Sequence, residues 1–128
     1  MKISRLIISL GSNTADGADT VARAVRMLRT VFRSVTATRT LQNAAVGMGA
    51  EAPDFHNALV LVRTTLSEDD ARAVCKAMES CLANTLPLRR QGVIVLDADI
   101  VMADGHVRRH KDYEREYFRT LLRELPEE

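Results

Sequence analysis

Two aspartates stand in an otherwise apolar run of the sequence. Asp97 and Asp99 interrupt residues 93–102, Val-Ile-Val-Leu-Asp-Ala-Asp-Ile-Val-Met, which have the composition of a β-strand. Side chains alternate along a strand, so both carboxylates point to one face, roughly 7 Å apart at the backbone. Two carboxylates about 6 Å apart repel by roughly 3 kcal/mol at an effective dielectric of 20. Mg²⁺ would offset this repulsion, because it binds through one or two carboxylates and substrate phosphates.

Other side chains have the chemistry to recognise a planar ring. Asn57 stands within an apolar run, where a strand residue bonded to its neighbours is the simpler explanation. Phe55 and Phe118 could stack on a ligand, although such rings more often belong to a core. Likewise, Asp97 and Asp99 could lie on a hydrated sheet face and pair with surface arginines.

A basic cluster lies near the C-terminal end of the sequence. His110 stands beside Arg108, Arg109 and Lys111, and such a cluster is either a solvated surface or a phosphate site. Glu79, within a predicted helix, is by itself a surface acid. Neither feature alone identifies a ligand.

The strands and helices that position these residues can be predicted from the hydrophobic periodicity and from the turn and capping residues between the periodic segments. Strands are predicted over 3–10, 34–41, 55–65 and 92–102, and helices from Asp19 or Thr20 to Phe32, from Ser67 to Leu82 and over 112–125. Residues 42–54 contain Gly47, Gly49 and Pro53 without a period, which predicts a flexible and functional loop. Asp104-Gly105 predicts a turn.

This order of elements predicts an α+β fold. Two strand–helix–strand halves joined by a hairpin form the ferredoxin-like βαββαβ sandwich with an antiparallel sheet, to which a C-terminal helix is added. The two helices of the halves would cover the same face of the sheet. The other face would then be open for a ligand. We expect a single domain over residues 1–128.

Composition and charge exclude several functional classes. Apolar residues make up 46% and charged residues 27%, which excludes a disordered tail, a collagen or a disulfide scaffold. The formal net charge of +1 gives no general attraction to nucleic acid or to an anionic membrane. An RNA-binding sheet would need exposed aromatics and a basic stripe, but aromatics are only 4% and the distinctive strand is acidic.

The cysteines and the N-terminal segment indicate the compartment. Cys75 and Cys81 are spaced to lie on different helix faces, so we expect two free thiols and a reducing compartment. The apolar run before Gly11 is too short for a signal peptide or a membrane span. We therefore expect a cytoplasmic protein, a monomer or a weak homodimer, with small-molecule ligands and no nucleic-acid or membrane partner.

Several segments, taken in order, resemble a known enzyme family. The segments are Ile8-Ser9-Leu10-Gly11-Ser12-Asn13, Asp54-Phe55-His56-Asn57-Ala58 followed by Thr64 and Leu66, Met78-Glu79, Leu96-Asp97-Ala98-Asp99-Ile100, and His110 with Asp112 and Phe118. Their order and spacing resemble the 6-hydroxymethyl-7,8-dihydropterin pyrophosphokinase family (2-amino-4-hydroxy-6-hydroxymethyldihydropteridine diphosphokinase) of folate biosynthesis. The resemblance covers nearly all of the chain.

The resemblance implies a role for each matching residue. Asp97 and Asp99 would hold two Mg²⁺ ions that bridge ATP to the substrate hydroxyl, and with His110 they would form the catalytic set. Phe55 and Phe118 would sandwich the pterin ring, while Asn57 would hydrogen-bond its edge. The residues implied on the nucleotide side are Glu79, Arg90, His110 and Asp112. The pterin hydroxymethyl oxygen would attack the β-phosphorus of ATP and give AMP and the pterin diphosphate.

The chain also departs from the family pattern. Asn84, Leu86, Ile94 and Glu116 stand where the family carries arginines, and the chain ends before the family's usual C-terminal extension. An arginine clamp on a transferring phosphoryl group can contribute roughly 10³ to 10⁵ in rate. The cations that could substitute from shifted positions are Arg89, Arg90, Arg108, Arg109, Lys111 and Arg115.

Two functions therefore fit the sequence. The first is ATP-dependent pyrophosphoryl transfer to the pterin, slowed by the missing arginines. The alternative is a catalytically degenerate member of the family that binds a pterin, a nucleotide or a protein partner. The retained aspartates favour ligand binding under either hypothesis.

Overall fold

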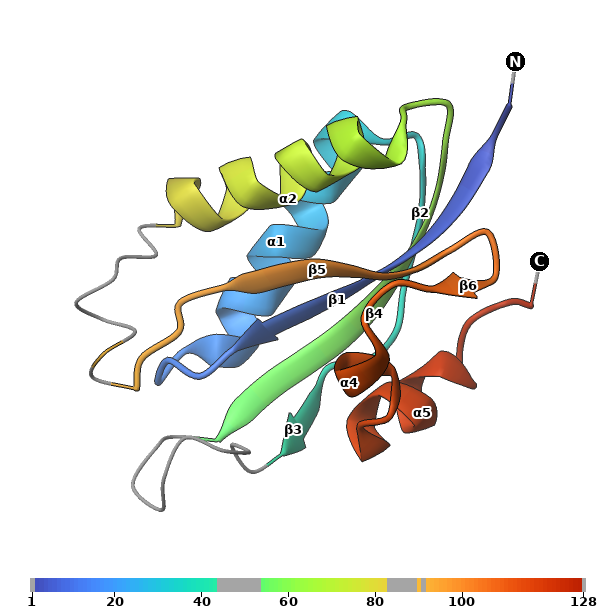
Figure 1. The fold of residues 1–128 in the computed structure, drawn as a ribbon. Helices are drawn as coiled ribbons and strands as arrows, with labels where there is room; N and C mark the ends of the chain where they lie inside the picture. Colours follow the sequence, from blue (N-terminus) through green and yellow to red (C-terminus); the bar gives the residue numbers. More distant parts are fainter. Residues whose placement is uncertain (1, 44–53, 83–89, 91, 128) are drawn as a thin grey trace.

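The computed structural model of the chain describes residues 2–43, 54–82, 90 and 92–127 (Figure 1). Its elements are β1 (Ser4–Ser12), α1 (Gly17–Val31), β2 (Ser34–Ala37), β3 (Leu41–Asn43), β4 (Phe55–Thr64), α2 (Glu68–Cys81), β5 (Asp97–Ala103), β6 (His106–Val107), α4 (His110–Tyr113) and α5 (Glu116–Leu122). The elements form an α+β fold, as the sequence predicts.

The six strands form one sheet in the order β2-β4-β1-β5-β6, and β3 extends the pairing along β4. Every pairing is antiparallel, and β1 lies between β4 and β5. Figure 1 shows α1 and α2 on one side of the sheet and α4 and α5 on the other. The ferredoxin-like arrangement predicted from the element order is confirmed.

Strict alternation along the central strands gives the sheet two different faces. Leu6, Ile8 and Leu10 of β1 are fully buried in the core beneath α1 and α2. The residues between them, Ile7 and Ser9, belong to the opposite face. Each fully buried aliphatic side chain contributes roughly 1.5–3 kcal/mol, so these residues stabilise the packing of α1 and α2 on this face.

The second face is only partly open, in contrast to the expectation of a free surface. Phe118, Leu121 and Leu125 pack over a second cluster of buried residues that includes Ile7 and Val101. This cluster covers one end of the face and leaves the end near Gly11 and Asn57 for polar groups. The C-terminal helices thus divide the face into a core and a candidate site.

Two predicted strands have different bounds in the structure. The predicted strand 34–41 is divided into β2 and β3, because Thr38 leaves the ladder to bond Leu59 through both its backbone and its side chain. The predicted strand 92–102 begins only at Asp97, since Gly92 has a positive φ and the backbone of Ile94 bonds Asn13 rather than a strand. Residues 44–53 of the predicted loop lie outside the described residues.

The helix starts and ends also refine the prediction. Ser67 caps α2 by accepting a hydrogen bond from the Asp70 amide, as predicted, whereas α1 begins at Gly17, earlier than expected. The single predicted helix over 112–125 is two short helices, α4 and α5, because Arg115 is extended. No Gly or Pro marks this break, so tertiary contacts override local propensity there.

Two further expectations concern the thiols and the membrane. Cys75 is buried and Cys81 is exposed, and both are free. Burial raises the pKa of the Cys75 thiol to about 12. Within the described parts of the chain, no helix is long and apolar enough to cross a membrane.

Asn13 connects the end of β1 to the segment that leads into β5. It is fully buried, and its side chain donates to the Gly92 carbonyl at 2.6 Å and accepts from the Ile94 amide at 2.6 Å. Its own amide donates to the Ile94 carbonyl at 3.0 Å. These three bonds replace a strand ladder just before the aspartates.

We predict that Asn13→Ala lowers the free energy of unfolding by about 2–4 kcal/mol, because a fully buried side chain is truncated and the backbone groups of Gly92 and Ile94 lose their partners. Urea unfolding followed by circular dichroism measures this. The exposed Gln42, whose side-chain Nε2 lies 3.4 Å from Asp54 Oδ2, provides the control, and Gln42→Ala should cost about 1 kcal/mol or less. Equal losses in the two variants would contradict the connecting role of Asn13.

Candidate functional site

A hollow of about 210 Å³ lies on the second face of the sheet. Its lining residues come from β1, β3, β4, β5, the segment before β5 and the C-terminal helices with the turn between them. They include Ser9, Gly11, Asn43, Phe55, Asn57, Ile94, Asp97, Asp99, Asp112, Arg115 and Tyr117. We refer to it as the main hollow. It brings together side chains that are more than 100 residues apart in the sequence, at the open end of the face.

Asp97 and Asp99 line this hollow from the first and third positions of β5. They lie opposite Gly11 and Ser9 of β1, and both are half-buried. Burial raises the pKa of Asp99, the Arg109 guanidinium acts in the opposite direction, and the Asp97 carboxylate raises it further. The pair is therefore brought together on one face as predicted, in a setting that disfavours the ionised form of Asp99.

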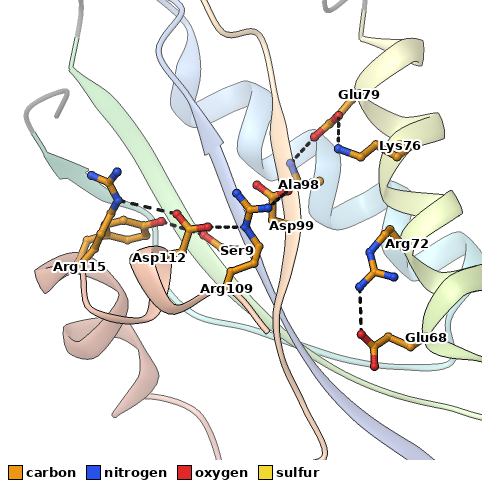
Figure 2. Close-up of polar contacts among 11 residues, drawn as sticks. Ser9, Glu68, Arg72, Lys76, Glu79, Ala98, Asp99, Arg109, Asp112 and Arg115 are labelled. Carbon is orange, nitrogen blue, oxygen red and sulfur yellow. Dashed lines mark hydrogen bonds and ion pairs between the residues drawn. The ribbon is translucent and has the colours of Figure 1, made fainter. Parts of the chain in front are cut away.

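Glu79 fixes the strand between the two aspartates. It is buried on α2, and its Oε2 accepts a hydrogen bond from the Ala98 amide at 2.9 Å (Figure 2). Its Oε1 lies 3.4 Å from Lys76 Nζ. Ala98 points into the core, so this bond holds the backbone of β5 while the flanking carboxylates face the hollow. The structure thus places Glu79 behind the site.

Phe55 and Asn57 line the hollow from the start of β4. Asn57 is buried, and its Nδ2 donates to Asn43 Oδ1 at 2.5 Å. A Cβ atom at Gly11 would lie 2.7 Å from Asn57 Oδ1 and 3.5 Å from the Phe55 ring. A side chain at residue 11 would therefore force the Asn57 amide to shift, whereas the Phe55 ring is at ordinary contact distance.

The aromatic residue that α5 contributes to the hollow is Tyr117. Its hydroxyl lies 3.1 Å from Ser9 Oγ, and burial raises its pKa. Phe118, the expected second ring of the sandwich, is fully buried in the second core cluster, with its ring centroid 5.6 Å from that of Tyr113. Arg115, the N-cap of α5, has an extended backbone, and in the helix that follows it is Tyr117, not Phe118, that lines the hollow. The sequence motifs do not reveal this.

Of the residues expected on the nucleotide side, some line the main hollow and others do not. Asp112 lines the main hollow, and its two oxygens lie between Arg109 and Arg115. His110 is exposed at the start of α4, and Arg90 is exposed as well. Within the described ranges, neither His110 nor Arg90 lines the main hollow.

A second hollow, also of about 210 Å³, lies on the other side of β5. Its lining residues are Arg72, Lys76, Ala98, Asp99, Ile100, Arg108 and Arg109, and we call it the cationic hollow. Asp99 lines both hollows. Figure 2 shows Arg109 reaching toward Asp99, with Arg72 and Lys76 on α2 across the strand. A strongly cationic surface therefore adjoins the aspartate pair.

The positions without arginine can now be located. Ile94 lines the main hollow, so no cation enters it from that position. Glu116 is the first residue of α5. Asn84 and Leu86 lie outside the described residues. Two cations from the segment after β6 do lie at these acids: Arg115 lines the main hollow, and Arg109 lines the cationic hollow and approaches Asp99 to 3.8 Å.

The donor set at β5 is compatible with Mg²⁺. In the part of the chain that the structure describes, no three His, Cys, Asp or Glu side chains cluster as a complete metal site. Mg²⁺ does not need one, because it usually takes one or two carboxylates and completes its shell with water and substrate phosphates. Two half-buried carboxylates of one strand that repel each other fit this requirement.

The fold and the site together define a ferredoxin-like protein with an acidic and amide-lined hollow. The family model of 7,8-dihydro-6-hydroxymethylpterin-pyrophosphokinase matches residues 7–127, and the chain belongs to this family. Members of the family bind a pterin and ATP and use Mg²⁺. The chain has no match among individual curated proteins.

We predict that Asp99→Asn stabilises the protein at pH 7 without Mg²⁺, raising Tm by about 2–4 °C. The folded-state pKa of Asp99 is raised, so its ionised form costs stability above that pKa, and a neutral amide removes the cost. The gain should shrink as the pH falls and Asp99 is protonated. Scanning calorimetry of both proteins measures the difference.

The exposed aspartate Asp69 provides the control, and Asp69→Asn should leave Tm nearly unchanged, because only its surface pair with Arg72 is lost. A clear fall of Tm in Asp99→Asn would mean that the attraction between Asp99 and Arg109 exceeds the cost of burial.

Proposed function

We propose that the chain transfers the β,γ-diphosphate of ATP to the hydroxymethyl group of 6-hydroxymethyl-7,8-dihydropterin, a step of folate biosynthesis. The observation that carries the proposal is one hollow with an aromatic ring, a buried amide and two aspartates. In this reaction the hydroxymethyl oxygen bonds to the β-phosphorus while the bond to the α,β-bridging oxygen breaks. The products are AMP, the pterin diphosphate and the hydroxyl proton.

The amide end of the main hollow suits the pterin ring. Asn57 offers both a carbonyl oxygen and N–H donors, which can pair with the edge of a heterocycle. Phe55 supplies a flat apolar wall beside it. A sandwich with Phe118 would require that ring to leave the core, so we assign the opposite wall to Tyr117.

The aspartate end suits the phosphates and their metal ions. Asp97 and Asp99 would hold the two Mg²⁺ ions, which when bound neutralise and orient the phosphate oxygens. Glu79 keeps the two carboxylates in register by anchoring the amide between them. Asp112 would lie on the nucleotide side together with His110 and Arg90. Such transfers depend on positioning and on charge neutralisation, which these residues supply without a covalent intermediate.

A second candidate function is ligand binding without catalysis. The observation that favours it is Ile94, which lines the main hollow at a position where the resemblance implies an arginine. Glu116 replaces another with an acid. The two candidates share the same hollow and differ only in turnover, so one assay separates them.

The deciding experiment mixes the purified protein with ATP, Mg²⁺ and 6-hydroxymethyl-7,8-dihydropterin and follows AMP release, with calorimetric titration of each ligand alone. We expect turnover that falls at least about 10³-fold in Asp97→Asn and in Asp99→Asn, because the carboxylates position both substrates. Asp69→Asn, at an exposed helix position, should keep the parent rate. Pterin binding without AMP release would instead establish the binding protein.

We further predict that Gly11→Ala weakens binding of the pterin by about tenfold or more and leaves MgATP binding within about twofold. The added methyl group would lie 2.7 Å from Asn57 Oδ1, so the amide must shift away from the ring edge that it would bind. Titration calorimetry with each ligand measures both affinities. A loss of MgATP affinity equal to the loss of pterin affinity would place the pterin elsewhere.

A further inference from the structure

Four charged side chains of alternating sign form a row across the site. Arg115 Nε lies 3.8 Å from Asp112 Oδ1, and Asp112 Oδ2 lies 2.5 Å from Arg109 Nε. Arg109 Nη1 in turn lies 3.8 Å from Asp99 Oδ1 (Figure 2). Arg109 therefore stands between a residue of the main hollow and the aspartate that both hollows share.

The backbone of β5 places Arg109 there. The pairing of β1 with β5 shifts register between Ile7 and Ile8, where the partners change from Met102 to Ile100 and skip Val101. The Val101 carbonyl accepts from the Arg108 amide at 2.7 Å and from the Arg109 amide at 3.4 Å. Bulges of this kind re-aim side chains next to active sites, and this one ties the segment after β6 to the aspartate strand.

The other cations near the shared aspartate are engaged elsewhere. Arg72 and Arg108 both pair with Glu68, and Lys76 pairs with the buried Glu79. By contrast, the contacts of Arg109 with described residues are with Asp112 and Asp99 at the site itself. Its side chain is 51% exposed, Nε is the atom that donates to Asp112, and Nη1 lies 3.8 Å from Oδ1 of Asp99, the residue that lines both hollows.

We propose that Arg109 binds the polyphosphate of the donor nucleotide at the junction of the two hollows, in place of the arginines that Ile94 and Glu116 do not supply. This inference rests on the proposed function, because it assigns the phosphate side of the same site. A guanidinium held by one carboxylate through Nε keeps paired N–H groups for phosphate oxygens. Arg72 and Lys76 of α2, although each is paired with a carboxylate, line the same cationic hollow and add donors for an anion there.

The test compares the parent with Arg109→Ala and Arg109→Lys by titration calorimetry, using Mg-tripolyphosphate and MgATP as probes. Arg109→Ala should weaken both by about 10- to 100-fold, because a charge-assisted contact is lost. Arg109→Lys should recover part of the affinity, while pterin affinity stays within about twofold. Arg39, an exposed arginine paired with Glu124 at 2.7 Å, provides the control, and Arg39→Ala should bind as the parent does.

The outcomes separate this inference from the proposed function. Binding of Mg-tripolyphosphate that depends on Arg109, without AMP release, would support the phosphate-binding role of Arg109 and reject the proposed transfer activity. AMP release with equal rates and equal nucleotide affinities in the parent and in Arg109→Ala would support the proposed transfer activity and reject the phosphate-binding role of Arg109. The inference also fails if the parent binds neither probe. It fails as well if Arg109→Ala binds MgATP more tightly, because Arg109 would then be a counter-ion that competes with Mg²⁺ for Asp99.

Discussion

The hydrogen bond from the Ala98 amide to the buried carboxylate of Glu79 is the interaction on which the site depends. Along residues 97–100, β5 pairs with β1 on one edge, and β6 pairs with residues 102 and 103. The outer edge of β5 therefore needs a partner from α2. Glu79 supplies it between Asp97 and Asp99, so a strand that carries two repelling acids keeps a fixed backbone.

The second constraint is the division of one sheet face between a core and a hollow. β1 and β4 are nearly continuous apolar runs, so their composition predicts central strands but not which of their residues face α1 and α2. Alternation around Asp97 and Asp99 does predict that these two side chains share one face. Neither pattern could predict how far the C-terminal helices extend over that face. Packing of Phe118 and Leu121 on Leu59 and Leu61 determines this extent. These contacts join residues about 60 positions apart, which no local pattern encodes.

The parts of the site that the sequence did not predict share a physical origin. Tyr117 rather than Phe118 lines the hollow because Arg115 is extended in a stretch without Gly or Pro. The strand begins at Asp97 because Asn13 bonds the preceding backbone. Arg109 lies near Asp99 because of a register shift between β1 and β5. In each case the residue types indicate the local preference correctly. A hydrogen bond or packing contact between distant segments then overrides that preference in the folded chain.

The acids of the site determine where positive charge is favoured around it. Asp97, Asp99 and Asp112 place three acids around the main hollow, and burial already penalises the ionised form of Asp99. Positive charge at this place is therefore favoured from whichever segment can deliver it. Residues 92–96 approach the strand through backbone bonds to Asn13, with the apolar Ile94 at the hollow. The segment after β6 is bonded to Val101 and carries arginines to the same acids. The backbone bonds of the two flanking segments thus hold an apolar residue on one side of the aspartates and arginines on the other.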